Sequence, residues 1–246
     1  MDEIERAAEL IQQNKGDVVA LTGAGISADS GIPTFRDKDG LWNKYRPEEL
    51  ATPEAFRRDP ERVWEWYSWR ISLVKRASPN EAHLALARME ELGYLKCVVT
   101  QNVDDLHERA CTRCLLKLHG DIMTARCTSC GFEIRWKDVP KGVPKCPICC
   151  SPMRPAVVWF GEPLDPEVLE KAERLFEEAK VALVVGTSAV VQPAASLPLI
   201  TKEMGGYVIE VNPRPTPLSS VADVLIRERA SVALPKILEA LEARQF

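Results

Sequence analysis

The sequence has no excess of positive charge and no long hydrophobic segment, and each absence excludes a class of function. Its formal net charge is −4 at pH 7, so bulk attraction to nucleic acid or anionic lipid is not expected. The longest apolar stretches, such as Val181–Val185, are far too short to cross a bilayer. The first residues, MDEIERAAELIQQNK, have apolar side chains at helical spacing and lack a signal-peptide pattern. We therefore expect a docked N-terminal helix, a cytoplasmic location, and no direct nucleic-acid or membrane partner.

What is present is an alternation of short apolar runs with longer helical patterns. Apolar residues make up 46% of the 246 residues, enough to bury a core. The pattern predicts strands at residues 18–22, 97–100, 157–160, 182–185, 208–211 and 224–226, and helices near residues 80–92, 166–179, 194–204 and 232–244. Near-continuous Val, Ile and Leu strands that alternate with helices predict an α/β fold, with a parallel sheet covered on both faces.

Two segments interrupt this alternation and form excursions from the main sheet. Residues 38–76 are rich in Trp, Tyr, Pro and Arg and predict helices and loops. Residues 124–154 hold paired cysteines and four prolines. We therefore expect a main domain made of residues 1–37, 77–123 and 155–246. The helical insert and the cysteine-rich module would together form a second, smaller domain.

Four cysteines in two Cys-x-x-Cys pairs predict a structural zinc site. Cys127 and Cys130 form the first pair, and Cys146 and Cys149 follow after 15 residues. Two such pairs can present four thiolates to one tetrahedral Zn²⁺, which leaves no position for water or substrate. The site is therefore expected to stabilise the fold rather than to catalyse a reaction. The alternatives are four unrelated buried cysteines or a disulfide scaffold, which is disfavoured without an export signal.

Three further cysteines lie close to these pairs. Cys111 and Cys114 form a third Cys-x-x-Cys pair outside the proline-rich module, and we expect free thiols there. Cys150 directly follows Cys149. We assign Cys149 as the fourth zinc ligand, because its spacing from Cys146 matches that of the first pair.

A glycine-rich turn follows the first predicted strand and indicates a nucleotide site. Gly23, Gly25 and Ala28 form a GxGxxA pattern, in which backbone N–H groups can approach a pyrophosphate. The pattern alone is weak evidence, because glycine turns often serve only packing. It also departs from a dehydrogenase, since the following SGIPTFRD breaks any helix and presents Phe35 and Arg36. A loop of this kind suggests a lid over a phosphate site, with chemistry at the ribose.

Polar residues also follow other predicted strands. The run TQNVDD at residues 100–105 follows one strand, GTS at residues 186–188 follows another, and Asn212 follows a third. In open parallel sheets, ligands bind beyond the carboxyl ends of the strands, so these groups are expected to converge on one crevice. Each of these residues taken singly is more often a cap or part of a turn.

Together these segments resemble the sirtuin family. The resemblance is carried by GAGIS, GIPTFRD, TQNVDDLHERA, KLHGD, the two Cys-x-x-Cys pairs, RPAVVWFGE, GTSAVVQPAA and EVNP, in family order and spacing over essentially the whole chain. It implies an NAD⁺-dependent protein deacylase with a Rossmann-like NAD-binding domain and a smaller zinc-containing domain. NAD⁺ is then a co-substrate, and acyl-lysine proteins bound as extended peptides are the partners.

The resemblance also implies roles for individual residues. His119 matches the catalytic base, which acts through the nicotinamide ribose hydroxyls, and Asn102 matches a residue that binds the ribose and its reacting water. An imidazole with a pKa of about 6.5 suits the acceptance of a ribose proton. The residues expected to bind NAD⁺ are Gly23, Ala24, Gly25, Phe35, Arg36, Gln101, Asn102, Val103, Asp104, Gly186, Thr187, Ser188, Asn212 and Ala230.

For the substrate, Val158, Phe160 and Gly161 lie in a run that resembles the strand pairing with the substrate backbone. In the implied reaction, the acyl-lysine carbonyl oxygen attacks the ribose carbon and expels nicotinamide. The 2′-hydroxyl, activated by His119, attacks the resulting alkylimidate, and water then releases lysine and 2′-O-acyl-ADP-ribose.

The chain departs from the family at Cys111 and Cys150, where glycine is usual. Glycine often supports a positive φ that cysteine tolerates poorly.

A predicted helix, RVWEWYSWR, places Tyr67 and Arg70 on one face. One interpretation is an apolar core stripe with Arg70 as a snorkelling rim residue. In the other, Tyr67 and Arg70, with Ala51 upstream, resemble class III sirtuins, which remove succinyl and malonyl groups. A guanidinium and a phenol can bind a carboxylate, and a small Ala51 leaves room for a longer acyl chain. We favour a deacetylase that is also a desuccinylase and demalonylase.

Two other functions are compatible with an NAD site. Mono-ADP-ribosyl transfer would use the same site, but its product gains the mass of ADP-ribose. A non-catalytic NAD-sensing or zinc-mediated docking module would release no nicotinamide with any acyl-peptide. The intact histidine, asparagine and lid motifs argue against this last function.

Overall fold

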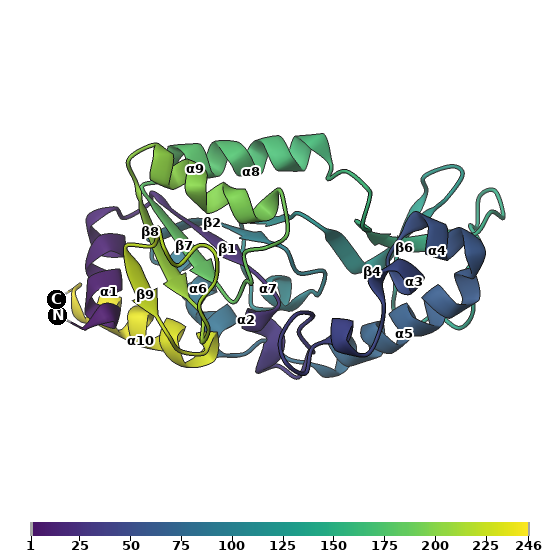
Figure 1. The fold of residues 1–246 in the computed structure, drawn as a ribbon, viewed down its shortest axis with the longest axis horizontal. Coiled ribbons are helices and arrows are strands. Elements are labelled where there is room, and N and C mark those ends of the chain that lie inside the picture. Colours follow the sequence, from purple (N-terminus) through teal and green to yellow (C-terminus); the bar gives the residue numbers. More distant parts are fainter. Residues whose placement is uncertain (1, 246) are drawn as a thin grey trace.

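The computed structural model describes residues 2–245, which form two lobes of unequal size (Figure 1). The larger lobe is built on a six-stranded sheet in the order β3-β2-β1-β7-β8-β9, and every neighbouring pair of strands is parallel. Its strands are β1 (Val18–Thr22), β2 (Leu95–Thr100), β3 (Leu115–Lys117), β7 (Val181–Val185), β8 (Tyr207–Val211) and β9 (Val224–Ile226). The predicted α/β fold with a Rossmann-like parallel sheet is confirmed.

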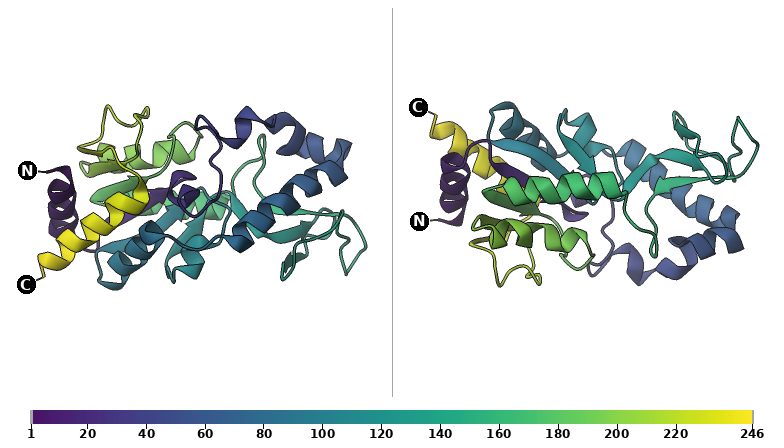
Figure 2. Two further views of the ribbon diagram at one scale, coloured as in Figure 1. Left: turned by 90° about the horizontal axis from the view of Figure 1, so that it is seen from below. Right: turned by 90° about the horizontal axis from the view of Figure 1, so that it is seen from above.

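Helices cover both faces of this sheet, because its central strands are almost entirely apolar. All residues of β1 and β7 are buried, so neither face is open to water. Helices α1, α6 and α10 pack against one face, and α8 and α9 pack against the other (Figure 2). These helices are α1 (Glu3–Gln13), α6 (Glu81–Glu91), α8 (Pro166–Glu178), α9 (Leu197–Glu203) and α10 (Ala230–Ala243). No helix within residues 2–245 has the length and apolar character needed to span a membrane.

The smaller lobe combines the two segments that interrupt the strand–helix alternation (Figure 1). An antiparallel sheet in the order β5-β4-β6 shares one apolar cluster with the helices. Trp64 is fully buried in that cluster, and its Nε1 donates to Met153 O at 2.8 Å. The elements are α3 (Pro47–Leu50), α4 (Pro53–Arg58), α5 (Pro60–Arg76), β4 (Gly120–Cys127), β5 (Glu133–Arg135) and β6 (Met153–Val157).

Two predicted elements differ from the structure. The strand expected at residues 157–160 is wrong, because β6 ends at Val157 and the chain then turns. The Glu162 carboxylate accepts from Trp159 N at 2.9 Å, and Glu162 N donates to Trp159 O at 3.0 Å. This local turn replaces pairing with a neighbouring strand, although the residues are apolar. The helix expected at residues 194–204 begins as a 3₁₀ turn (Ala194–Ser196) before α9.

A disulfide bond joins Cys97 to Cys114, so the expectation that Cys114 is free is wrong. Cys97 lies in β2, and Cys114 immediately precedes the neighbouring strand β3, which brings the two Cα atoms to 4.7 Å. Cys114 pairs with Cys97 because the two residues are neighbours on adjacent parallel strands. The Cys-x-x-Cys spacing, which would pair Cys114 with Cys111, does not decide the partner. Cys111 is free and exposed, as expected.

Cys111 and Cys150, the two departures from family glycines, both adopt left-handed backbone conformations. Their φ angles are 69° and 64°. Such a conformation brings Cβ close to the backbone and costs roughly 1–2 kcal/mol for a residue other than glycine. The turns therefore keep the geometry that glycine supports, and cysteine adopts it with strain.

Candidate active site

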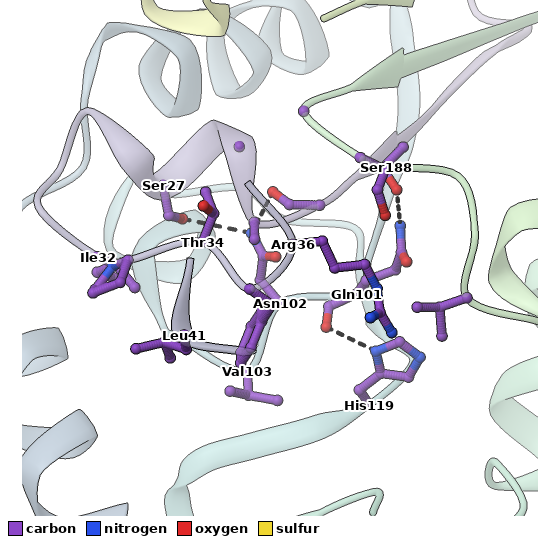
Figure 3. A pocket seen from close by; sticks show the side chains of 18 of the residues that line it. Ser27, Ile32, Thr34, Arg36, Leu41, Gln101, Asn102, Val103, His119 and Ser188 are labelled. Atoms are coloured by element: carbon purple, nitrogen blue, oxygen red, sulfur yellow. Dashed lines mark hydrogen bonds between the residues drawn. The ribbon is translucent and has the colours of Figure 1, made fainter. Parts of the chain in front are cut away.

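A cavity of about 1380 Å³ lies where the carboxyl ends of the central strands meet the smaller lobe. Its wall includes His119 and every residue predicted to bind NAD⁺ or substrate. Those residues are Gly23, Ala24, Gly25, Phe35, Arg36, Ala51, Tyr67, Arg70, Gln101, Asn102, Val103, Asp104, Val158, Phe160, Gly161, Gly186, Thr187, Ser188, Asn212 and Ala230. Figure 3 shows His119, Asn102 and Ser188 around this space, although they come from segments far apart in the sequence.

Close backbone packing explains the glycines of the first turn. Gly23 N donates to Val185 O at 3.0 Å and Gly25 N donates to Gly186 O at 2.7 Å. A Cβ atom on Gly23 or Gly25 would lie 2.8 Å from Gly186 O, a distance that real side chains do not adopt. The glycine pattern therefore allows the ends of β1 and β7 to meet, and the turn forms part of the cavity wall.

A backbone carbonyl fixes the tautomer of His119. Its Nδ1 lies 3.0 Å from Gln101 O (Figure 3), and because a carbonyl only accepts, the neutral ring carries its proton on Nδ1. Nε2 then has a free lone pair and can act as a base. Burial lowers the pKa of His119, and the hydrogen bond to Gln101 opposes this shift. The Gln101 side chain is held in turn by Thr187 Oγ1, at 2.9 Å from Nε2.

Asn102 and Asp104 follow β2 and are buried against the glycine turn. Asn102 Nδ2 donates to Gly23 O at 3.0 Å. Ser27 Oγ donates to one oxygen of Asp104 at 2.9 Å, and Leu106 N donates to the other at 3.0 Å. Burial nevertheless raises the pKa of the Asp104 carboxyl. The turn after β2 thus presents a fixed amide and a fixed carboxyl group to the cavity.

Two further histidines, His83 and His107, are buried next to the residues that line the cavity, and their contacts keep them neutral. Asn80 N donates to His83 Nδ1 at 3.1 Å, and His83 Nε2 lies 3.3 Å from Ser27 Oγ. His107 Nε2 lies 2.8 Å from Thr22 Oγ1, and its Nδ1 has no partner among residues 2–245. Neither Nδ1 therefore faces an acceptor for a second proton. Burial lowers the pKa of His83 to about 4 and that of His107 to about 3.

We expect His83 and His107 to stay neutral in the folded protein at pH 5. Since the unfolded chain protonates histidine at a pKa of about 6.5, each buried imidazole removes up to roughly 1.4 kcal/mol of folding stability per pH unit below that value. An NMR titration of the three histidine C2 protons between pH 7.5 and 5 measures this directly. A midpoint near 6.5 for His83 or His107 would show that our account of these contacts is wrong.

The end of the cavity beyond β7 and β8 is fixed by a buried carboxylate. Asn212 Nδ2 donates to Thr187 O at 2.8 Å, which joins the loops after these two strands. Glu210 on β8 is 1% exposed and accepts from Ser219 Oγ at 2.6 Å and from Arg227 Nη1 at 2.8 Å. The roles of Glu210 and Arg227 in fixing this end were not predicted from the sequence. One feature of the sequence could have indicated this contact. Glu210 is a lone carboxylate in an apolar strand, and a buried carboxylate needs a partner.

The opposite end of the cavity holds Tyr67 and Arg70. Tyr67 is 2% exposed, and burial raises its pKa. The Arg70 guanidinium carbon lies 4.8 Å from the ring centroid of Trp66, 5.0 Å from that of Phe35 and 5.3 Å from that of Tyr67. Arg70 forms no ion pair with any residue in the described range 2–245. Among residues 2–245, the nearby Asp104 carboxyl group acts on Arg70 only beyond ion-pair distance, so this end offers a cation packed on aromatic rings with no carboxylate in direct contact.

The segment after β6 connects this end to His119. Val158 N donates to His119 O at 2.8 Å, and Phe160 N donates to Ala51 O at 3.0 Å. Phe160 is 42% exposed, and Gly161 has a φ of 86°, which ends the segment in a turn. Residues 158–161 therefore lie along the cavity between the histidine and the helical insert.

The four predicted zinc ligands form a compact cluster in the smaller lobe. The Sγ atoms of Cys127, Cys130, Cys146 and Cys149 all lie within 4.8 Å of one another. The Sγ atoms of Cys127 and Cys149 are 3.4 Å apart, and those of Cys130 and Cys146 are 3.6 Å apart. Tetrahedral Zn–S bonds of about 2.3 Å place sulfur atoms about 3.8 Å apart, so the cluster fits one Zn²⁺. Cys150 is exposed and does not belong to the cluster, which supports the assignment of Cys149.

Purified protein is expected to contain about one zinc per chain by elemental analysis. Cys127→Ala should lose zinc and stability, because three thiolates hold a structural ion far less tightly than four. Cys150→Ala is the matched control and should keep both. Full zinc and full stability in Cys127→Ala would contradict the ligand assignment.

A model of the Sir2 family matches residues 23–193, more than half of the chain. The chain belongs to the Sir2 family. This confirms the resemblance to sirtuins. The Sir2 relative NAD-dependent protein deacylase 1 of Archaeoglobus fulgidus is 56% identical over 236 residues, which cover 95% of this chain and 96% of the relative. The NAD-dependent protein deacylase of Pyrococcus abyssi is 52% identical over 242 residues, which cover 96% of both chains.

Solved Sir2 structures share the whole architecture. A Sir2 homolog–NAD complex is 54% identical and matches with a TM-score of 0.94, covering 100% of this chain and 96% of that chain. A Sir2 protein bound to a myristoylated histone peptide is 37% identical, with a TM-score of 0.83 and a coverage of 99% and 98%. Proteins with this Sir2 fold have thus been seen with NAD and with an acylated peptide.

Proposed function

We propose that this chain is an NAD⁺-dependent protein-lysine deacylase that transfers acyl groups from lysine to ADP-ribose. The products are nicotinamide, the free lysine and 2′-O-acyl-ADP-ribose. The observation that carries the proposal is the placement of His119. Gln101 O fixes its ring and leaves Nε2 unprotonated, and the ring lies in the wall of the same cavity as the glycine turn. The Sir2 relatives named as NAD-dependent protein deacylases, and the Sir2 complex with an acylated peptide, support the same substrate class here.

The two halves of NAD⁺ are assigned to different parts of the cavity. We assign the adenosine side of NAD⁺ to the loops after β7 and β8, and its nicotinamide side to the turn after β2, near His119. The adenosine side comprises Gly186, Thr187, Ser188, Asn212 and Ala230, and the remaining NAD⁺ contacts are Gly23, Ala24, Gly25, Phe35, Arg36, Gln101, Asn102, Val103 and Asp104. This assignment is supported by the hydrogen bond from Asn212 to Thr187 O, which fixes the adenosine loops together.

The chemistry requires a base, a fixed ribose and the exclusion of water. Bound NAD⁺ supplies the ribose carbon from which nicotinamide leaves as the acyl oxygen attacks. His119 accepts a ribose hydroxyl proton at Nε2, and Gln101 O stabilises the imidazolium through its Nδ1 proton. Asn102 positions the ribose. Phe35 shields the reacting ribose carbon from water once nicotinamide leaves, and Arg36 orders the loop that covers the cofactor.

The substrate peptide is assigned to residues 158–161. An extended peptide can add its backbone to an exposed segment, and its lysine then enters the cavity. Val158, Phe160 and Gly161 supply this surface, and the hydrogen bond from Val158 N to His119 O places it beside the base. The assigned domain division, with inserts at residues 38–76 and 124–154, and the cytoplasmic location stay predictions.

The finer proposal is that succinyl- and malonyl-lysine are preferred over acetyl-lysine. Arg70 is a half-buried cation that forms no ion pair within residues 2–245, and burial lowers its pKa, so a carboxylate in direct contact would stabilise its charge. Tyr67 lies beside it, and the small side chain of Ala51 leaves space for a longer acyl group.

Nicotinamide release with a panel of peptides tests both levels of the proposal. At saturating NAD⁺, release should depend on an acyl-lysine peptide and be faster with succinyl- or malonyl-lysine than with acetyl-lysine. Activity on acetyl-lysine alone would remove the acidic-acyl preference and keep the deacylase. No release with any acyl-peptide would contradict the proposed function.

A further inference from the structure

The Trp159 indole forms a buried hydrogen bond with the Tyr67 hydroxyl. The Nε1–Oη distance is 2.9 Å, and the two residues are 3% and 2% exposed. Indole Nε1 is a donor only, so the Tyr67 oxygen must accept this bond. The proton of the Tyr67 hydroxyl therefore has to point away from Trp159.

No residue in the described range 2–245 accepts that proton. The Tyr67 oxygen receives the bond from Trp159 and a weaker contact from the Arg70 guanidinium, and both of these partners are donors. Its other polar neighbour is the Arg70 guanidinium, which also has donors and no acceptor. Tyr67, Arg70 and Trp159 all line the cavity. The phenol thus holds an unused donor beside an unpaired cation, and an anionic acceptor would satisfy both groups.

Trp159 is held in place from its other side. The Arg154 guanidinium carbon lies 3.8 Å from the centroid of the indole. Arg154 is fixed in turn by a bidentate pair with Glu162, at 2.7 and 2.8 Å, and Glu162 also accepts from Trp159 N. The ring of Phe56 packs at 5.4 Å. Because its backbone and its ring plane are both constrained, the indole N–H has a fixed direction toward Tyr67.

We propose that Trp159 is a positioning residue for acidic-acyl specificity, because its N–H occupies the Tyr67 oxygen and turns the Tyr67 proton toward the acyl carboxylate beside Arg70. This inference rests on the proposed preference for succinyl- and malonyl-lysine. An acetyl group has no carboxylate to receive the proton. The quantity that reports the role of Trp159 is therefore the ratio of kcat/KM for a succinyl-lysine peptide to kcat/KM for the same acetyl-lysine peptide.

Trp159→Phe keeps an aromatic ring and removes the N–H, so the Tyr67 hydroxyl can rotate. The ratio is expected to fall by about three- to tenfold. The loss should be in KM for the succinyl peptide at little change in its kcat, since the carboxylate is bound in the ground state and the transition state alike. In a Tyr67→Phe background, Trp159→Phe should lower the ratio no further, because the donor that it orients is already absent.

Trp64→Phe is the matched control. Trp64 lies on the same helix as Tyr67, is fully buried, and donates its own indole hydrogen bond to Met153 O at 2.8 Å. Its loss should lower the melting temperature and leave the ratio unchanged. If Trp159→Phe does not fold, β-(3-benzothienyl)alanine at position 159 keeps the bicyclic shape and replaces the N–H with sulfur, with the same expected loss.

Each outcome separates the inference from the proposal beneath it. A fall in the ratio when Trp159→Phe is made in the wild type, with no further fall when it is added to Tyr67→Phe, supports the positioning role. A ratio that stays within twofold of wild type, or equal losses on both peptides, overturns it. If Trp159→Phe keeps the ratio and Tyr67→Phe loses it, the positioning role of Trp159 is wrong but the acidic-acyl proposal still stands. A wild type without activity on succinyl- or malonyl-lysine overturns both.

Discussion

Replacement of His119 by alanine is expected to lower kcat by about 10²–10⁴-fold, because the ribose hydroxyl loses its general base. NAD⁺ affinity should stay close to that of the wild type, since within residues 2–245 the ring makes one hydrogen bond, to Gln101 O, and its removal leaves the rest of the cavity wall in place. Steady-state turnover of an acyl-peptide and calorimetric NAD⁺ titration measure the two quantities. A variant that retains half of the wild-type kcat would contradict the assigned role.

The pH dependence of the wild type provides a second check on His119. Burial lowers the pKa of this imidazole, so the base stays unprotonated below the ordinary histidine value of about 6.5. Activity should therefore persist in mildly acidic buffer and fall only as the pH approaches the lowered pKa. An acid limb centred above 6.5 would show that His119 is either exposed or not the base.

Replacement of Arg70 by methionine is expected to reduce kcat/KM for succinyl-lysine by about ten- to a hundredfold. Hydrogen bonds to charged groups contribute roughly 1.5–3 kcal/mol, and the guanidinium is the cation at this end of the cavity. Turnover of acetyl-lysine should fall far less, because an acetyl group offers nothing for the guanidinium to bind. Parallel kinetics on the two peptides measure the preference.

Arg62→Met is the matched control for Arg70→Met. Arg62 lies on the same helix, but it is exposed and pairs with Glu49 at 3.3 Å on the surface. Its loss should leave the preference unchanged, since exposed ion pairs contribute about 0–1 kcal/mol and this one is outside the cavity. Equal losses on both peptides for Arg70→Met would show that Arg70 supports the helix and does not select the acyl group.

Much of the fold and the membership of the site could be predicted from the sequence. The strands β1, β7 and β8 are rich in buried apolar residues, and a parallel sheet needs such strands because both of its faces are covered. The carboxyl ends of parallel strands meet along one edge, which is why Asn102, Ser188 and Asn212 converge on one cavity. The spacing of the two Cys-x-x-Cys pairs predicted which four cysteines form one cluster.

What could not be predicted depends on contacts between segments distant in sequence. The pairing of Cys97 with Cys114 follows from the neighbouring positions of β2 and β3, which no local spacing encodes. The apolar residues after Val157 resemble a strand, but the Glu162 carboxylate folds them into a turn. The bond between Trp159 and Tyr67 spans 92 residues and exists only because α5 packs beside that turn.

The most direct test of the account is mass spectrometry of both products after incubation with NAD⁺ and an acyl-lysine peptide. We predict that the peptide loses the mass of its acyl group, that nicotinamide is released, and that the nucleotide product carries the same acyl group on ADP-ribose. A peptide that keeps its acyl group, with ADP-ribose mass gained by the peptide or by the protein, would contradict the assignment as a deacylase and identify an ADP-ribosyltransferase.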